Sequence, residues 1–213
     1  MRDAQFWALG VSAILTQMNG AEHDQLHSRG NTAAAKKDII HSLKVYWSVN
    51  NREDLLENLV WLGEGGGHNL GFIEWVKLFQ LKSEHRIQAY LKANPEKQSM
   101  FLVANYYQSL SSVGIRAWDD GRYVSLCRWG ATAGYLTEDE AWGRILAHAR
   151  DVQSAFTGWD QFAISYIAGK QYWQEKTEVD FLMKEMAHVT ALNTDKDSPW
   201  VKLPWDLDLN TSI

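Results

Sequence analysis

Apolar residues recur at intervals of three and four positions along almost the whole sequence, which is the spacing of one face of an α-helix. The clearest stripes lie within residues 55–62, 141–149, 159–167 and 179–189. Alternation with a period of two, which is typical of half-buried strands, is scarce. The spacing therefore predicts an all-α protein.

Proline is rare in this chain, which supports the same interpretation. The 213 residues contain only 3 prolines, whereas average usage of about 5% would give roughly ten. A chain with so little proline can hold long helices, and we expect about eight or nine of them. Their predicted positions are near residues 3–18, 31–47, 51–62, 70–92, 95–110, 115–129, 137–152, 158–170 and 174–191. No linker rich in Pro, Gly or Ser divides the sequence, so we expect one compact domain over residues 1–213.

Several helix boundaries are marked in the sequence. Residues 137–140 form a capping box, in which Thr and Glu side chains each bond a free backbone amide at the helix start. Asn94 followed by Pro95 places a capping residue before a proline at the first helical position. Gly63, Gly130 and Gly169 each follow an apolar stripe and predict helix ends.

The chain has 11 tryptophans, a heavy load that predicts a Trp-rich core. The expected aromatic framework consists of Trp118, Trp129, Trp142, Trp159 and Trp173. In the tail, residues 198–213, Pro199-Trp200 and Pro204-Trp205 recur five positions apart, in an extended pattern that cannot be helical at its prolines. We expect this tail to dock on the body, in cis or in trans. The alternative is an exposed peptide that awaits a partner.

Charge and cysteine content narrow the classes of partner. The net charge is −5 and the densest basic pair is Lys36-Lys37, so nucleic-acid binding, which needs clustered cations, is disfavoured.

No apolar stretch approaches the roughly 18 to 20 residues of a membrane span, and the apolar stretch 6–15 lacks the flanks of a signal peptide. The single cysteine, Cys127, excludes an intrachain disulfide; we expect a packed core thiol and a cytoplasmic protein.

Two short motifs resemble ligand sites without completing them. His23 and His27 have the spacing of a zinc-binding helix, but no third ligand stands out, so we expect no metal and no cofactor. The glycine-rich stretch 63–68 lacks the lysine of a phosphate-binding loop. It is either a flexible turn between helices or a loop whose amides and His68 line a small site.

The most informative stripe joins Trp118, Arg122, Leu126 and Trp129 on one face of a predicted helix. An arginine on such a face needs a partner, because an unpaired buried charge is costly. The possible partners are Asp119, Glu140 and Asp160. The candidate functional or buried polar cluster is Asp119, Arg122, Arg128, Glu140 and His68. Two interpretations stay open: an ion pair that fixes helix register, or an arginine that lines a pocket for an anion or a partner's carboxylate.

The segment 118–122, continued by residues 126–129, 134–136, 140–142 and 156–159, resembles the bacterial family known as domain of unknown function 1266. Upstream and tail segments are similar too, namely residues 47–49, 52–56, 61–62, 67–68, 199–200 and 203–205. The resemblance implies a compact bacterial protein, and it brings no activity and no catalytic residues. It points to Trp118, Asp119, Arg122, Trp142 and Trp159 as positions that define the family.

No arrangement of Ser, His and Asp in the sequence suggests a nucleophile with its base. The sequence therefore favours a non-enzymatic protein-interaction module of the bacterial cytoplasm over an enzyme. One version is an immunity protein that binds and neutralises a toxin. The alternative is a small-molecule or anion-binding protein, or an enzyme, with a pocket near Arg122, Asp119 and His68. The partner and the oligomeric state are left open.

Overall fold

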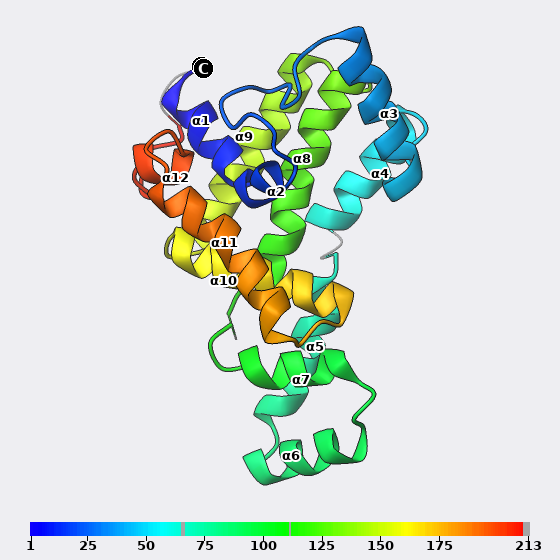
Figure 1. The fold of residues 1–213 in the computed structure, drawn as a ribbon, viewed down its shortest axis with the longest axis vertical. Coiled ribbons are helices and arrows are strands. Elements are labelled where there is room, and N and C mark those ends of the chain that lie inside the picture. The colour runs from blue at the N-terminus through cyan, green and yellow to red at the C-terminus, as the bar shows by residue number, and fades with distance from the viewer. Residues whose placement is uncertain (65–66, 111, 211–213) are drawn as a thin grey trace.

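The fold was obtained as a computed structural model that describes residues 1–64, 67–110 and 112–210. These residues form helices and turns without a strand, which confirms the all-α prediction (Figure 1). The helices are α1 (Asp3–Gly10), α2 (Ala13–Met18), α3 (Ala33–Trp47), α4 (Arg52–Gly63), α5 (Asn69–Gln80), α6 (Glu84–Ala93), α7 (Gln98–Tyr106), α8 (Arg116–Ala133), α9 (Glu138–Ala155), α10 (Trp159–Gln174), α11 (Val179–Thr194) and α12 (Pro199–Lys202).

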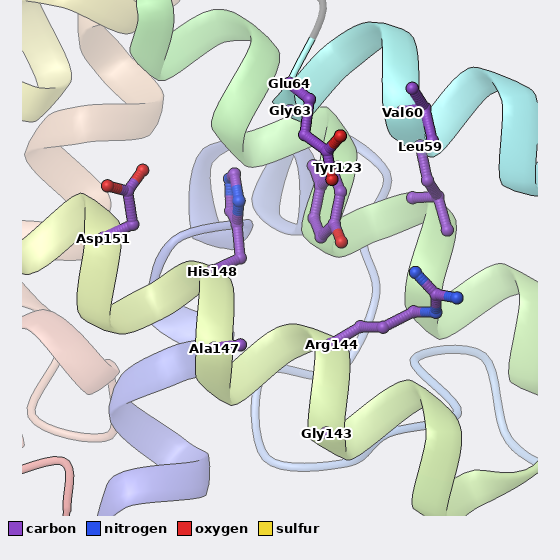
Figure 2. Close-up of a pocket in the computed structure, with 10 residues that line it drawn as sticks. All are labelled: Leu59, Val60, Gly63, Glu64, Tyr123, Gly143, Arg144, Ala147, His148 and Asp151. Carbon is purple, nitrogen blue, oxygen red and sulfur yellow. The ribbon is translucent and has the colours of Figure 1, made fainter.

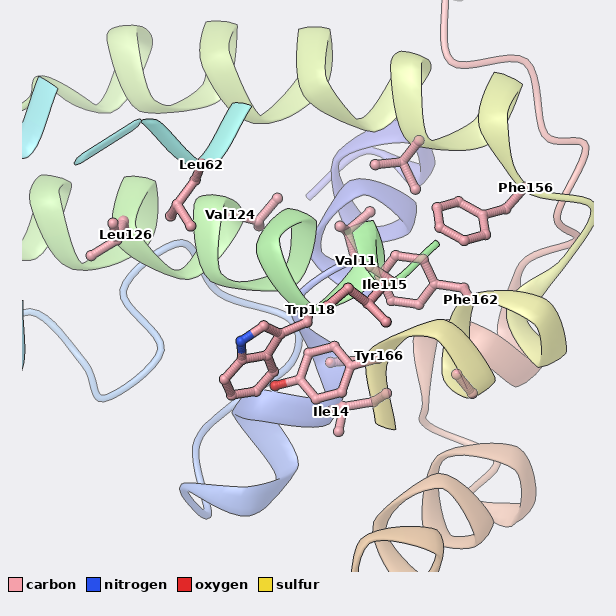
Figure 3. Packing of buried hydrophobic residues seen from close by; sticks show 14 of the residues in the cluster. Val11, Ile14, Leu62, Ile115, Trp118, Val124, Leu126, Phe156, Phe162 and Tyr166 are labelled. Carbon is pink, nitrogen blue, oxygen red and sulfur yellow. The ribbon is translucent and has the colours of Figure 1, made fainter. Parts of the chain in front are cut away.

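Helix α8 is the centre of the molecule. It packs against α2, α3, α4, α9 and α10, and it is buried on almost every side. Figure 3 shows Trp118 of α8 against Tyr166 of α10, with Val11 and Ile14 beside them. Cys127, also on α8, is fully buried as expected, and burial raises the pKa of its thiol to about 12. A helix surrounded in this way can carry polar side chains only where partners meet them.

Two glycines that were expected to end helices lie inside them instead. Gly130 is in α8 and Gly169 is in α10. A β-carbon at Gly130 would lie 2.5 Å from Cδ2 of Leu55, and one at Gly169 would collide with Cβ of Trp118. The glycines therefore allow close packing of α8 on α4 and of α10 on α8. The C-terminal cap of α8 is Gly134, with a left-handed φ of 81°.

Two predicted helices are split. The first is interrupted between α1 and α2, and the second between α5 and α6 at residues 81–83. The rings of Phe79 and Tyr90 are 6.4 Å apart, whereas residues at this separation in one straight helix would be roughly 16 Å apart. The break thus lets α6 fold back and bury its apolar face. Asn94 caps the end of α6, and α7 begins at Gln98, so the predicted start at Asn94-Pro95 is wrong.

The predicted Trp-rich core is confirmed, and its densest part joins the two ends of the chain. Trp159 stacks on Trp200 with ring centroids 5.0 Å apart and lies 4.7 Å from Trp205. Trp7 lies 4.8 Å from Trp159 and 5.1 Å from Trp205. The indole of Trp200 donates to the carbonyl of Gly10 at 2.9 Å, so the polar edge of this ring is satisfied although it is buried.

The tail packs on the body of the same chain. Trp7 donates its indole N–H to the carbonyl of Pro204 at 3.1 Å, and Gln153 of α9 donates to the carbonyls of Trp205 and Leu207. The tail is not wholly extended, because Pro199 is the first residue of α12. Proline is tolerated there, since a residue at the first helical position needs no N–H for the helix.

Candidate functional site

The structure brings together three of the five residues in the predicted polar cluster. Asp119 and Arg122 lie one turn apart on α8, and both meet His68 at the start of α5. Nη2 of Arg122 donates to Oδ1 of Asp119 at 2.8 Å and lies 2.9 Å from Nδ1 of His68. The same nitrogen of His68 is 3.0 Å from Oδ1 of Asp119. Asp119 is thus the carboxylate that pairs with Arg122, and neither Glu140 nor Asp160 does so.

The second oxygen of Asp119 holds the loop that precedes α5. The backbone amides of His68 and Asn69 donate to Oδ2 at 2.9 and 3.1 Å. Gly67 has a φ of +49°, and a β-carbon there would lie 2.5 Å from Cγ of Asp119. Gly65 and Gly66 lie outside the described residues. In the described part of the glycine-rich stretch, the amide of Gly67 donates to the carbonyl of Trp61 and the amide of His68 donates to Asp119, so neither lines an open site.

Tryptophans surround the guanidinium of Arg122. Its Cζ is 4.6 Å from the ring centroid of Trp118, 5.2 Å from that of Trp47 and 5.9 Å from that of Trp61. A cation over aromatic faces is stabilised by the ring quadrupoles. Burial nevertheless lowers the pKa of Arg122, because the charged form loses its water, and Asp119 opposes that shift. The Nε of Arg122 has no hydrogen-bond partner among the described residues.

Two rings in this region reach the surface. Trp173 lies 5.6 Å from Trp118 and exposes 51% of its area, while Trp61 exposes 42%. We call the set Trp47, Trp61, Trp118 and Trp173 around Arg122 the tryptophan surface. The predicted aromatic framework is therefore divided: Trp118 and Trp173 belong to this surface, and Trp159 belongs to the cluster at the chain ends. Trp129 and Trp142 are half-buried against the core.

Arg128 belongs to a different site, where it meets neutral groups and no carboxylate among the described residues. It donates to the hydroxyls of Ser12 and Thr16 and to the carbonyls of Glu22, Gln25 and Leu26. Complete burial lowers its pKa to about 9, which still leaves it charged at neutral pH. Its donors are thus all used to fasten the segment before α3 onto α8.

Glu140 also lies apart, at the start of α9. It binds Arg52 of α4 through contacts of 2.6 and 3.0 Å, and it accepts from the amide of Thr137 at 2.9 Å. Thr137 in turn accepts from the amide of Glu140, so the predicted capping box is confirmed. The hydrogen bond from Arg52 is the largest cause of a pKa of about 2 for Glu140. This residue joins α4 to α9 and takes no part in the cluster around Arg122.

The paired histidines are held by separate partners. His23 bonds Gln17, whereas His27 lies 3.0 Å from both Thr132 and Glu138. Within the described ranges, no group of three or more His, Cys, Asp or Glu side chains is placed to hold a metal ion.

A second polar cluster, which the sequence analysis did not single out, lies on the next face of α8. Nε of Arg116 donates to Oδ2 of Asp120 at 3.0 Å, and its Nη2 donates to Asp151 at 2.5 Å. Nε2 of His148 lies 3.0 Å from Oδ1 of Asp120, and its ring stacks on Tyr123 at 4.0 Å. The available signal was the i, i+4 spacing of Arg116 with Asp120, but their meeting with α9 depends on the fold.

This second cluster borders a cavity of about 440 Å³ between α4, α8 and α9 (Figure 2). The wall is formed by Leu59, Val60, Gly63, Glu64, Tyr123, Gly143, Arg144, Ala147, His148 and Asp151. It includes none of the five residues of the predicted polar cluster. A much smaller cavity lies beside Arg128 and is lined by Ser125 and Trp129 among others. Neither cavity touches Arg122, Asp119 or His68.

Comparisons with known proteins agree with the resemblance noted in the sequence. The model of the family described as "Protein of unknown function (DUF1266)" matches residues 42–205. The chain is 28% identical over 132 residues to the uncharacterized protein YbeR of Escherichia coli strain K12, and 27% identical over 134 residues to the uncharacterized protein YbeU of the same organism. Each match covers 60% of this chain and 55% of the relative, so the chain spans about half the length of these relatives.

No solved structure matches the chain significantly. Among the described residues, no helix combines the length and the apolar character that a membrane crossing requires. The family match spans both polar clusters of α8 and the tryptophan surface.

Proposed function

The chain belongs to the family of unknown function DUF1266, and we propose that it is a protein-interaction module whose partner docks on the tryptophan surface. The observation that carries this proposal is the exposure of Trp61 and Trp173, at 42% and 51%, near a buried arginine: Trp61 lies over Arg122, and Trp173 contacts Trp118, which also lies over Arg122. Tryptophan and arginine dominate the few residues that supply most of the binding energy in protein interfaces. Large rings left half in water here are therefore available to a partner.

The underlying contacts favour docking over capture of a free anion. Asp119 already neutralises Arg122, and its other oxygen is filled by two backbone amides. An anion would have to compete with this bonded carboxylate. A partner that covers Trp61 and Trp173 gains apolar burial without disturbing these bonds.

The test is capture of a partner from the native cell, with surface variants beside the wild type. Trp61→Ala and Trp173→Ala each remove one half-exposed ring, and Leu81→Ala is the control, because Leu81 is 85% exposed at the far end of α5. We expect one stoichiometric partner with the wild type and the control, and at least a tenfold loss (about 1.4 kcal/mol) with either tryptophan variant. Equal capture by all four proteins would refute docking at this surface.

The identity of the partner decides the finer form of the proposal. If the chain is a cytoplasmic immunity protein, the captured partner is a toxin, and expression of the chain protects a cell that produces this toxin. The Trp173→Ala variant should then protect less well than Leu81→Ala. A captured partner without toxicity would exclude this form and leave the interaction module intact.

A further inference from the structure

The cavity between α4, α8 and α9 has the dimensions of a small-molecule site. Its volume of about 440 Å³ falls within the roughly 300 to 1,000 Å³ of known ligand pockets. The wall is contributed by α4, α8 and α9 (Figure 2). The shape of the cavity therefore depends on how these three helices pack. The cavity lies on a different face of α8 from the tryptophan surface. Ligand binding in the cavity is therefore a separate inference from the docking of a partner on that surface.

A glycine of α9 lies at the open side of this cavity. Gly143 lies within the helix Glu138–Ala155, it is exposed, and a β-carbon there would meet no atom within 4 Å. A glycine in a helix interior costs roughly 0.5–1 kcal/mol relative to alanine. Unlike Gly130, Gly143 offers no close helix packing in return. Because Gly143 lines the cavity, a larger side chain at this position would project into open space there.

A buried polar atom without a partner lies at the same place. The side chain of His148 is only 10% exposed, and its Nε2 is 3.0 Å from Oδ1 of Asp120. This contact does not form a hydrogen bond, and Nε2 has no other hydrogen-bond partner among the described residues. Buried polar groups are rarely left unsatisfied, and an exception calls for an explanation. A bound ligand that shifts the ring by a small rotation would supply one.

The cavity carries charges of both signs. At the His148 end, Arg116 is shared by Asp120 and Asp151, and one guanidinium cannot neutralise two carboxylates. Glu64, which is exposed, lies beside Tyr123 and adds a negative charge there (Figure 2). Arg144 reaches toward the hydroxyl of the same tyrosine and forms no ion pair within the described part of the chain.

Tyr123 stays a neutral hydrogen-bond donor in this setting. Burial raises the pKa of its hydroxyl, although the nearby Arg144 works in the opposite direction. A cation and a phenol side by side are suited to the two oxygens of a carboxylate. Leu59, Val60 and Ala147 provide the apolar part of the wall.

We propose that this cavity binds a small zwitterion of the amino-acid class. Its carboxylate lies at Arg144 and the Tyr123 hydroxyl, and its ammonium lies toward Glu64. A simple anion would face the carboxylate of Glu64, and a simple cation would leave Arg144 unpaired. The apolar side chain of such a ligand packs against Leu59 and Val60.

The experiment uses the full chain and measures binding by titration calorimetry. The common L-amino acids are tested singly at millimolar concentration. The tightest binder is then compared with its amide, which lacks the carboxylate, and with its deaminated acid, which lacks the ammonium. We expect at least one amino acid to bind, and both analogues to bind at least tenfold more weakly, a loss of about 1.4 kcal/mol.

Variants locate the site. Gly143→Leu places a side chain in the open space and should abolish binding while it raises helix propensity, so folding is preserved. Arg144→Gln should weaken binding at least tenfold, whereas Arg150→Gln, an exposed arginine of the same helix, should bind as the wild type does. The proposal is overturned if no amino acid binds, if the deaminated acid binds equally well, or if Gly143→Leu, folded by circular dichroism, binds like the wild type.

Discussion

Asp119 and Asp120 are neighbours on α8, and each is buried beside an arginine and a histidine, yet the two clusters differ in what they leave open. Asp119 uses both oxygens for Arg122, His68 and two amides at the start of α5. Asp120 binds Arg116, but its contact with His148 leaves a buried nitrogen unsatisfied beside a cavity. Successive residues of a helix point about 100° apart, so the same residue types meet different surroundings.

The comparison separates a structural role from a binding role. A carboxylate whose acceptors are all filled holds elements together, and it has little capacity left for a ligand. A carboxylate that binds charged side chains at the edge of a cavity can respond to a ligand that enters the cavity. We therefore assign the Asp119 cluster to fold maintenance beneath the tryptophan surface, and the Asp120 cluster to the wall of a binding site.

The largest effect should come from Asp119→Ala. This change leaves Arg122 buried without its carboxylate and frees two amides at the start of α5, so we expect a loss of about 3–5 kcal/mol in the free energy of unfolding. Urea unfolding followed by circular dichroism measures it. A loss below about 1 kcal/mol would mean that the cluster is not the structural one.

Asp120→Asn should cost less, about 1–2 kcal/mol. Arg116 keeps its contact with Asp151, and the amide oxygen of asparagine can still accept from Arg116. His148 loses no hydrogen bond, because its Nε2 makes none. The same urea titration applies, and a cost equal to that of Asp119→Ala would erase the distinction between the two clusters.

Two glycine substitutions should have opposite signs. Gly67→Ala introduces a β-carbon at a left-handed φ and against the carboxylate of Asp119, so we expect destabilisation by about 1–2 kcal/mol. Gly143→Ala meets no atom and removes a flexible residue from α9, so we expect stabilisation by about 0.5–1 kcal/mol. Thermal unfolding of both variants in the same buffer tests this prediction. Stability changes of the same sign would contradict the contrast between the filled surroundings of Gly67 and the open surroundings of Gly143.

The smallest effect concerns a half-buried carboxylate outside both clusters. The pKa of Glu140 is lowered from 4.5 to about 2, chiefly by the hydrogen bond from Arg52. Its stabilising contribution is therefore present above pH 4.5 and is lost as the pH falls from 4.5 toward 2. Glu140→Gln should be slightly less stable at neutral pH and should lose less stability across that window. Unfolding midpoints measured along an acid series show whether the two curves converge.

Local signals in the sequence predicted much of the fold. The apolar spacing gave the helical class, and the box at Thr137 and Glu140 marked a true start, because capping depends on residues only three positions apart. The break at residues 81–83 carries no glycine or proline. It arises because Phe79 and Tyr90 pack together, and a contact of this kind is settled by the tertiary fold.

The candidate site was predicted only in part for the same reason. Asp119 and Arg122 lie one turn apart on a predicted helix, so Asp119 was among the three possible partners of Arg122, but the choice over Glu140 and Asp160 depended on the fold. The prediction that Gly130 and Gly169 end helices was wrong. A glycine after an apolar stripe can cap a helix or allow another helix to pack closely, and only the neighbouring helix decides between these roles. The cavity of His148 and Arg144 needs α4, α8 and α9 in place before it exists.

The bond between Trp200 and Gly10 joins residues 190 positions apart. A ribosome that adds roughly 5–20 residues per second needs about 10–40 seconds to make the chain between them. During that time Trp7, which is wholly buried in the finished protein, has neither the ring of Trp205 nor the carbonyl of Pro204 to cover it. Helix α1 is thus enclosed only after the segment that contains Trp200, Pro204 and Trp205 has been made, and until then the nascent chain carries an exposed aromatic segment.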